Sequence, residues 1–280
     1  MEKLILSALA DEYDADFETQ LKGLNEFGIK YIEVRFVDGK NISTLSDSEL
    51  ERVKSLLNTY GIKVSAIGSP LGKIRLDEDI DAHLELAEKI CRIANCLGTE
   101  CVRMFSFYPP EDKNIADYRA EVISALERML DVAERYSVKF CHENEARIYG
   151  ETPEACLDLL THFNGRLKAV FDMGNFALEG YDPIKAYGLL KEHIEYFHIK
   201  DGFKKGAIVP AGKGEAMIGE ILAEYSANTD KETFISLEPH LQTFSGLGAL
   251  TESNLQHEYV YETQQAAFAD AVEKLKEIIK

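Results

Sequence analysis

The amino-acid sequence predicts a single (β/α)₈ barrel over residues 1–280. Short β-rich runs alternate with amphipathic stretches from one end of the chain to the other, and eight such alternations can be counted. No Pro/Gly-rich linker or low-complexity segment interrupts the series. The length suits one barrel of this kind, which typically needs about 250 residues.

The eight predicted strands are short runs rich in β-branched and aromatic residues, each bounded by polar or turn-forming residues. They cover residues 4–10, 30–36, 62–68, 100–107, 138–144, 167–172, 194–200 and 233–238. A doubly wound open sheet is the competing arrangement. It typically has a glycine-rich first turn, and the first turn here, SALADEYDADF, contains no Gly-x-Gly.

The predicted helices show apolar residues at three- and four-residue spacing, and several of their ends are marked by local chemistry. Gly61 and Gly98 follow helices, where a left-handed residue is favoured. Thr152 and Pro153 form an N-cap followed by a first helical position. The helices are expected near 14–27, 47–60, 77–97, 113–136, 153–163, 183–191, 214–227 and 257–279.

The charge and the apolar pattern exclude several classes of partner. The formal net charge is −18 and no basic block is present, which argues against nucleic acid and against anionic membrane surfaces. No apolar run reaches the roughly 20 residues that span a bilayer, and the acidic residues after MEKLILSALA make a poor secretory signal. The five cysteines lack a Cys-x-x-Cys pair, which indicates reduced thiols in a cytoplasmic protein.

Four potential metal ligands lie at the ends of the last four predicted strands: Glu143, Asp172, His198 and Glu238. The carboxyl ends of neighbouring barrel strands meet at one mouth, where barrel enzymes keep their chemistry. Three carboxylates at that mouth would repel one another, and a divalent cation removes the conflict. Oxygen-rich ligation with one imidazole suits one Mn²⁺, Mg²⁺ or Co²⁺ ion, and Zn²⁺ also fits.

The alternation of side chains along a strand predicts which other residues face the barrel axis. Cys141 shares the inward face of Glu143, and His142 faces the helices and is excluded as a ligand. Tyr196 and Lys200 share the face of His198. On the earlier strands, Glu33 with Arg35 or Arg103 either forms an ion pair inside the barrel or contributes to the site.

Five motifs together resemble the xylose isomerase-like TIM barrel superfamily, in its sugar phosphate isomerase/epimerase branch. They are HENEARIYGETPEACLDLL, VFDMGN, YFHIKD, VPAGKGE and SLEPH. The resemblance covers nearly the whole chain and implies that Glu143, Asp172, His198 and Glu238 bind one divalent metal. It further implies a metal-dependent sugar isomerase or epimerase of carbohydrate metabolism. In such enzymes the two glutamates act as acid and base on opposite faces of the substrate, which is a sugar, keto-sugar or sugar phosphate. The resemblance implies that the reaction proceeds by proton abstraction next to a carbonyl and through a metal-bound enediolate.

The sequence departs from the family pattern at one position. Many members carry a histidine three residues after the strand-6 aspartate, and here that residue is Asn175. An amide can bond a hydroxyl group but cannot shuttle protons as imidazole does. Arg35, Arg103, Asn175, Lys200 and Lys204 are the candidate substrate-binding residues.

Three other functions stay open at this stage. One is a dehydratase or lyase of the same fold, of the dehydroshikimate or inosose type. A DNA-repair enzyme like endonuclease IV would need more strand-end histidines and a less acidic surface, and a non-catalytic sugar-binding module would not need both glutamates. Residues 203–215 and 239–259 are predicted as lids over the substrate, or else as surface loops or contacts of a homo-oligomer.

Overall fold

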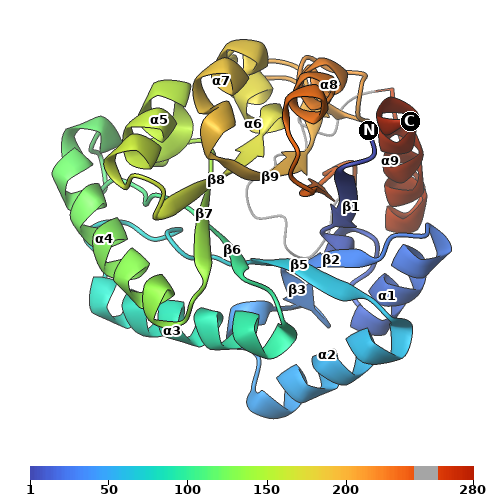
Figure 1. Ribbon diagram of the computed structural model, residues 1–280, viewed down its shortest axis with the longest axis horizontal. Coiled ribbons are helices and arrows are strands. Elements are labelled where there is room, and N and C mark those ends of the chain that lie inside the picture. The colour runs from blue at the N-terminus through green and yellow to red at the C-terminus, as the bar shows by residue number, and fades with distance from the viewer. Residues whose placement is uncertain (243–257) are drawn as a thin grey trace.

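The computed structural model describes residues 1–242 and 258–280, and its centre is a nearly closed barrel of eight parallel strands (Figure 1). The hydrogen-bonded order is β1-β12-β9-β8-β7-β6-β5-β2, and β1 and β2 lie side by side where the sheet ends meet. The strands are β1 (Leu4–Ala8), β2 (Tyr31–Val34), β5 (Lys63–Gly68), β6 (Cys101–Met104), β7 (Lys139–Glu143), β8 (Leu167–Asp172), β9 (Ile194–Ile199) and β12 (Thr233–Leu237).

Helices form a ring around the outside of this barrel (Figure 1). They are α1 (Phe17–Glu26), α2 (Asp47–Tyr60), α3 (Ile80–Leu97), α4 (Arg119–Arg135), α5 (Pro153–His162), α6 (Met173–Glu179), α7 (Pro183–Leu190), α8 (Ile218–Asn228) and α9 (Gln264–Ile279). The last helix lies beside β1, and the Met1 amino group donates to the Ile279 carbonyl at 3.1 Å. None of the described helices has the length and apolar character needed to cross a membrane.

The predicted barrel is confirmed, and every strand begins within one residue of its expected start. The strands end up to three residues earlier than expected. After β2, β9 and β12 the next polar residue, which is Arg35, Lys200 or Glu238, lies at the barrel mouth. Two two-stranded hairpins and the seven-residue helix α6 were not predicted. The hairpins are β3 (Phe36–Val37) with β4 (Lys40–Asn41) and β10 (Asp201–Gly202) with β11 (Ile208–Val209).

The apolar core divides into two layers. The large layer lies between the sheet and the helices, where Phe140, Phe171 and Phe197 are fully buried. A small cluster of Ala66, Cys141, Val170 and Tyr196 fills the lower part of the barrel interior, which is the part toward the amino-terminal ends of the strands. Polar and charged side chains occupy the upper part of the interior, toward the carboxyl ends of the strands. Because these charges are buried, they need partners within the barrel.

The loop after β9, predicted as a lid, is tied down by one carboxylate. Asp201 accepts four backbone N–H groups at 2.8–3.0 Å, from Gly202, Gly212, Gly214 and Ala216. A Cβ at Gly214 would lie 2.3 Å from the Asp201 carboxylate, so the close approach requires glycine. The second predicted lid, 239–259, lies mostly outside the described residues, which resume at residue 258.

Asp201→Asn should destabilise the fold, because an amide keeps only one acceptor oxygen for the four converging N–H groups. The loss should be about 2 kcal/mol or more, as for other buried bonds to a charged group. Urea unfolding measures the loss, with Asp230→Asn as the matched control, since the Asp230 side chain is exposed and pairs with Lys3 at the surface. Equal unfolding free energies for the two variants would contradict this role of Asp201.

Candidate metal centre

Four side chains from neighbouring strands converge at the carboxyl end of the barrel. Glu143 ends β7, Asp172 ends β8, His198 lies in β9 and Glu238 follows β12. One oxygen or nitrogen atom from each lies within 4.8 Å of the others, and all four residues are buried. The sheet order β12-β9-β8-β7 makes the four strands adjacent, as the sequence predicted.

The two ring nitrogens of His198 have different surroundings. Nδ1 faces the cluster, 3.1 Å from Glu143 Oε1 and 3.3 Å from Glu238 Oε2. Nε2 lies 2.9 Å from Glu33 Oε2 on the other side. With no cation present, burial opposes a charge on the ring, but Glu33 and Glu143 outweigh it and hold the His198 pKa well above its usual value. A bound cation would take Nδ1 of the neutral ring and leave the proton on Nε2 toward Glu33.

Asp172 is positioned by its own backbone. The Asn144 side chain accepts a hydrogen bond from the Asp172 N–H at 3.0 Å and donates to its carbonyl at 2.9 Å. Asp172 Oδ1 accepts from the Asn175 N–H at 2.8 Å and so caps α6. Oδ2 is buried and lies 3.0 Å from Lys200 Nζ, but without hydrogen-bond geometry to any described residue. A buried carboxylate oxygen without a hydrogen bond fits a cation-binding site.

Three buried cations contact the carboxylates of this set. Arg103 Nη1 donates to Glu143 Oε2 at 2.9 Å, and Arg35 Nη1 donates to Glu238 Oε1 at 2.6 Å. Lys200 Nζ lies 3.3 Å from Glu238 Oε2. Glu143 Oε1 and Glu238 Oε2 both face His198 Nδ1, and Lys200 shares the Glu238 oxygen.

The carboxylates of this region outnumber the permanently charged cations beside them. Among the described residues, Arg35, Arg103 and Lys200 are buried against the carboxylates of Asp11, Glu12, Glu33, Glu143, Asp172 and Glu238. Burial raises the pKa of Asp172 to about 6, and the neighbouring Glu143 and Glu238 add to the rise against Lys200. Buried uncompensated carboxylates are costly, so the ligand set fits a divalent metal ion.

A second group of possible ligands, Glu12, Glu238 and His240, shares Glu238 with the first. Here the protein supplies its own cation, because Arg35 contacts Glu12 at 3.2 Å as well as Glu238. Burial and the charge of Lys200 hold the pKa of His240 well below its usual value. His240 therefore places a neutral imidazole at the edge of the site.

A cavity of about 420 Å³ opens onto the cluster. Of the predicted substrate-binding residues, Arg35, Arg103, Asn175 and Lys200 line it. Asn175 Nδ2 donates to the Asn144 carbonyl at 2.8 Å and lies 3.5 Å from Glu143 Oε1. Lys204 does not line the cavity, because its side chain is exposed and lies against Gly180.

Sequence reasoning did not assign roles to several residues that the structure brings to this site. Glu33 stood out only as a possible ion-pair partner, and its contact with His198 spans 165 residues of sequence. Asn144 shows no periodicity that sets it apart from a loop residue. Phe105, Tyr108 and His240 line the cavity from loops that follow the strands, where side-chain direction has no sequence pattern.

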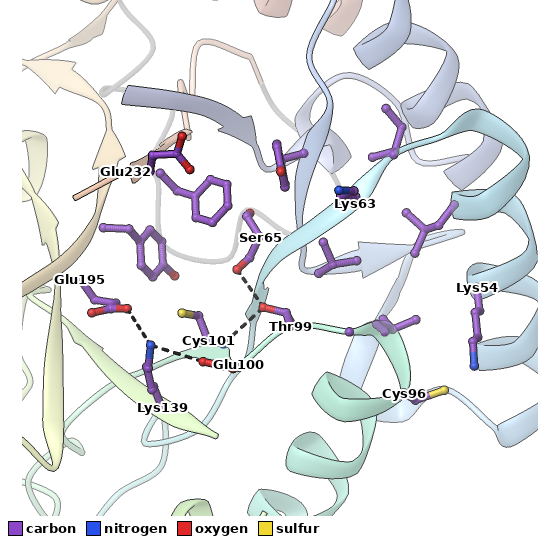
Figure 2. Close-up of a pocket in the computed structure, with 18 of the residues that line it drawn as sticks. Lys54, Lys63, Ser65, Cys96, Thr99, Glu100, Cys101, Lys139, Glu195 and Glu232 are labelled. Carbon is purple, nitrogen blue, oxygen red and sulfur yellow. Dashed lines mark hydrogen bonds and ion pairs between the residues drawn. The ribbon is translucent and has the colours of Figure 1, made fainter. Parts of the chain in front are cut away.

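A larger cavity, about 600 Å³, lies at the opposite end of the barrel (Figure 2). It contains none of the predicted site residues and is lined by the amino-terminal ends of the strands, including Ser65, Cys101 and Lys139. Because barrel enzymes carry their chemistry at the carboxyl end, size alone does not identify the site. The smaller cavity is the candidate centre.

A (β/α)₈ barrel with a buried cluster of three carboxylates and one imidazole is thus the class of protein that fold and site define. The chain belongs to the xylose isomerase-like TIM barrel family, whose sequence pattern it matches over residues 21–278. No curated protein sequence matched the chain.

Solved structures with the same fold cover nearly all of the chain. A D-allulose 3-epimerase from Methylomonas sp., in complex with D-allulose, has a TM-score of 0.74, 18% identity and coverage of 98% of this chain and 96% of its own. A family member from Mycobacterium smegmatis, in complex with magnesium, has a TM-score of 0.72 and 15% identity, with coverage of 99% of this chain and 96% of its own. The probable 3-DHS dehydratase AsbF, from Bacillus anthracis, has a TM-score of 0.72 and 18% identity, with coverage of 98% of each chain. At these identities the likeness establishes the fold.

Glu33→Gln should weaken binding of Mn²⁺ by roughly 10- to 100-fold, because the carboxylate that orients the ligand imidazole would be lost. Isothermal titration with Mn²⁺ after chelator treatment measures the change. Tyr196→Phe is the matched control, since it removes only the phenol that donates to Glu33 at 3.1 Å. Unchanged affinity in Glu33→Gln would show that His198 does not depend on Glu33.

Proposed function

We propose that the protein is a metal-dependent isomerase or epimerase that moves a proton next to the carbonyl of a sugar. The observation that carries the proposal is the position of the two glutamates. Glu143 and Glu238 come from the outer strands of the four-strand set, with Asp172 and His198 between them. A substrate in the cavity would therefore meet one carboxylate on each side.

The roles of the residues follow from their surroundings. Burial would raise the pKa of Glu143, but the charges of His198 and Arg103 outweigh it and hold that pKa well below its usual range. Glu143 is therefore ionised and can accept a proton, and a well-placed carboxylate base contributes roughly 10²–10⁴-fold to a rate. Glu238 lies on the opposite side to return a proton. A divalent ion held by the four ligands would stabilise the negative charge that develops on the substrate oxygen.

The other cavity residues would bind and orient the substrate. Lys200, Asn175 and His240 present an ammonium, an amide and a neutral imidazole at the edge of the cluster. These groups suit hydroxyl and carbonyl oxygens. The fold is shared with an epimerase crystallised with D-allulose and with a family member crystallised with magnesium, which supports a sugar substrate and a divalent ion.

The cavity favours a neutral sugar over a sugar phosphate. A phosphate group is normally bound by several cationic or N–H donors. Four of the five cations that line the cavity in the described chain already contact carboxylates: Arg35, Lys73, Arg103 and Lys200, with Arg147 as the fifth. Residues 243–257 contain no Lys or Arg that could add to them.

Dehydration is the second candidate, favoured by the shared fold of the probable dehydratase AsbF. It begins with the same proton abstraction but ends with loss of a hydroxyl group as water. Lys200, whose Nζ lies among the ligand carboxylates, would be the proton donor to that hydroxyl group.

Glu143→Gln and Glu238→Gln should each abolish the incorporation of solvent deuterium at the carbon next to the substrate carbonyl. An amide cannot take the proton, and the Mn²⁺-loaded wild type should incorporate deuterium from D₂O. NMR of D-allulose and related ketoses, before and after chelation, follows the label and the stereochemistry of the product. Exchange retained in both variants would contradict the assigned bases, and an unsaturated product would establish dehydration.

Free ketoses should be turned over with a kcat/KM at least tenfold higher than that of their phosphate esters. A phosphate would have to displace an existing ion pair in the cavity. The comparison uses matched pairs of free and phosphorylated ketoses, with Arg147→Ala as a variant that should not change the preference. A preference for the phosphate ester that is lost in Arg147→Ala would contradict the expectation and identify Arg147 as its binding group.

A further inference from the structure

A groove beside the candidate metal centre is not used by the proposed function. It measures about 940 Å³ and lies between the loop after β6, residues 105–118, and the loop after β7, residues 144–152. Both loops leave the carboxyl ends of their strands, so the groove lies at the same end of the barrel as the metal centre. Tyr108 and Arg147 line both the groove and the cavity of about 420 Å³ over the metal ligands. The two spaces therefore adjoin at these two side chains.

The walls of the groove are held by contacts within the protein. On one side, the Tyr108 N–H donates to the Ile74 carbonyl at 2.9 Å, and the Leu76 N–H donates to the Tyr108 carbonyl at 3.1 Å. On the other side, the Tyr149 hydroxyl donates to Asp158 Oδ2 at 2.8 Å. A binding surface that is fixed in advance loses less entropy when a ligand occupies it.

The lining of the groove suits a neutral ring with hydroxyl groups. Apolar surface comes from Pro109, Pro110 and Ile115, and two tyrosines add rings that each carry a polar end. The charged side chains of the lining are three acids and three bases: Glu111, Asp112, Glu151, Arg75, Lys113 and Arg147. Because these signs balance, the groove favours a neutral ligand over an ionised one. A pyranose ring, with an apolar C–H face and a rim of hydroxyl groups, has this chemistry.

Arg147 lies at the junction of the two spaces in a conformation that is unfavourable for arginine. Its φ is 68°, in the left-handed region, where a non-glycine residue is strained. The Arg147 N–H donates to Glu151 Oε2 at 2.5 Å, and the Tyr181 hydroxyl donates to Glu151 Oε1 at 3.2 Å. Among the described residues the Arg147 guanidinium has no hydrogen bond or ion pair. Its donors are therefore available to a ligand that crosses the junction.

We propose that the substrate carries a second, neutral sugar ring, which lies in the groove while the reacting ketose lies in the cavity. This assignment rests on the proposed function, because that function directs the carbonyl end of the ketose to the metal ligands. The second ring is then attached at the far end of the ketose. Tyr108 and Arg147 contact the hydroxyl groups on both sides of the linkage. They are the residues that distinguish a glycosylated ketose from a free one.

The proton exchange of a glycosylated ketose, compared with that of the free ketose, tests the second site. The probes are D-fructose and 6-O-α-D-glucopyranosyl-D-fructose, and NMR follows solvent deuterium incorporated into each by the Mn²⁺-loaded protein. The glucosylated ketose should exchange with a kcat/KM about tenfold higher or more, because hydrogen bonds to a charged donor are among the stronger ones.

Two variants of the groove should each remove this preference. Arg147→Ala deletes the donor at the junction, and Ala116→Trp fills the groove with an indole ring, since Ala116 lines it. Arg92→Ala is the matched control, because Arg92 is an exposed arginine of α3 that lines neither space. It should keep the preference. A preference that survives either groove substitution, or its absence from the unaltered protein, would overturn the proposal.

Failure of the proposed function gives a different result. If neither sugar exchanges deuterium, the isomerase or epimerase assignment fails, and equilibrium binding decides the second site. Isothermal titration with the same two sugars should then show affinity for the glucosylated ketose about tenfold higher than for D-fructose, and this difference should disappear in Arg147→Ala. Equal affinities of the unaltered protein for the two sugars would overturn the second site.

Discussion

The structure depends on the electrostatic cost of gathering carboxylates inside a barrel. Besides Asp201, which backbone N–H groups satisfy, six acidic side chains are buried around the carboxyl end of the strands, and among the described residues they have only three permanently charged buried partners. Buried charges are tolerated when they are paired and hydrogen-bonded. Arg35 and Arg103 contact the outer oxygens of Glu238 and Glu143, and Lys200 contacts Asp172 and Glu238 at the edge of the position that the inner oxygens share. That position suits a divalent ion, and the choice of every neighbouring residue follows from it.

The barrel converts this requirement into geometry. Adjacent parallel strands carry the four candidate ligands, so that Glu143, Asp172, His198 and Glu238 converge without any one loop having to fold around an ion. Further contacts then fix each ligand. Glu33 holds the far nitrogen of His198, and Asn144 holds the backbone of Asp172. Ligands fixed in advance lose less entropy when the ion binds.

The sequence could predict the barrel and the convergence of the four candidate ligands because both obey short periodic rules. Eight strand starts and the inward face of β7 follow from alternation alone, and His142 indeed faces outward, where its Nε2 lies 2.9 Å from Ser106 Oγ. The contact between Glu33 and His198 obeys no such rule, because it joins β2 to β9 across the barrel. The contacts by which Asp201 holds loop 203–215 follow no such rule either. From its glycines and lysines, that loop was predicted to be a lid. Those glycines instead allow the backbone to approach a carboxylate.

The two ends of the barrel show how one strand can contribute both to apolar packing and to a charged site. Along β7, Cys141 and Glu143 face the same interior at different depths, one among apolar side chains and the other among charges. Apolar packing at the lower level fixes the spacing of the strands, and that spacing sets the distance between Arg103 and Glu143 above. A change in the packing of the lower layer would therefore displace Arg103 and Glu143 at the upper ends of β6 and β7. A close-packed interior transmits strain in this way, since it cannot absorb a displacement in empty volume.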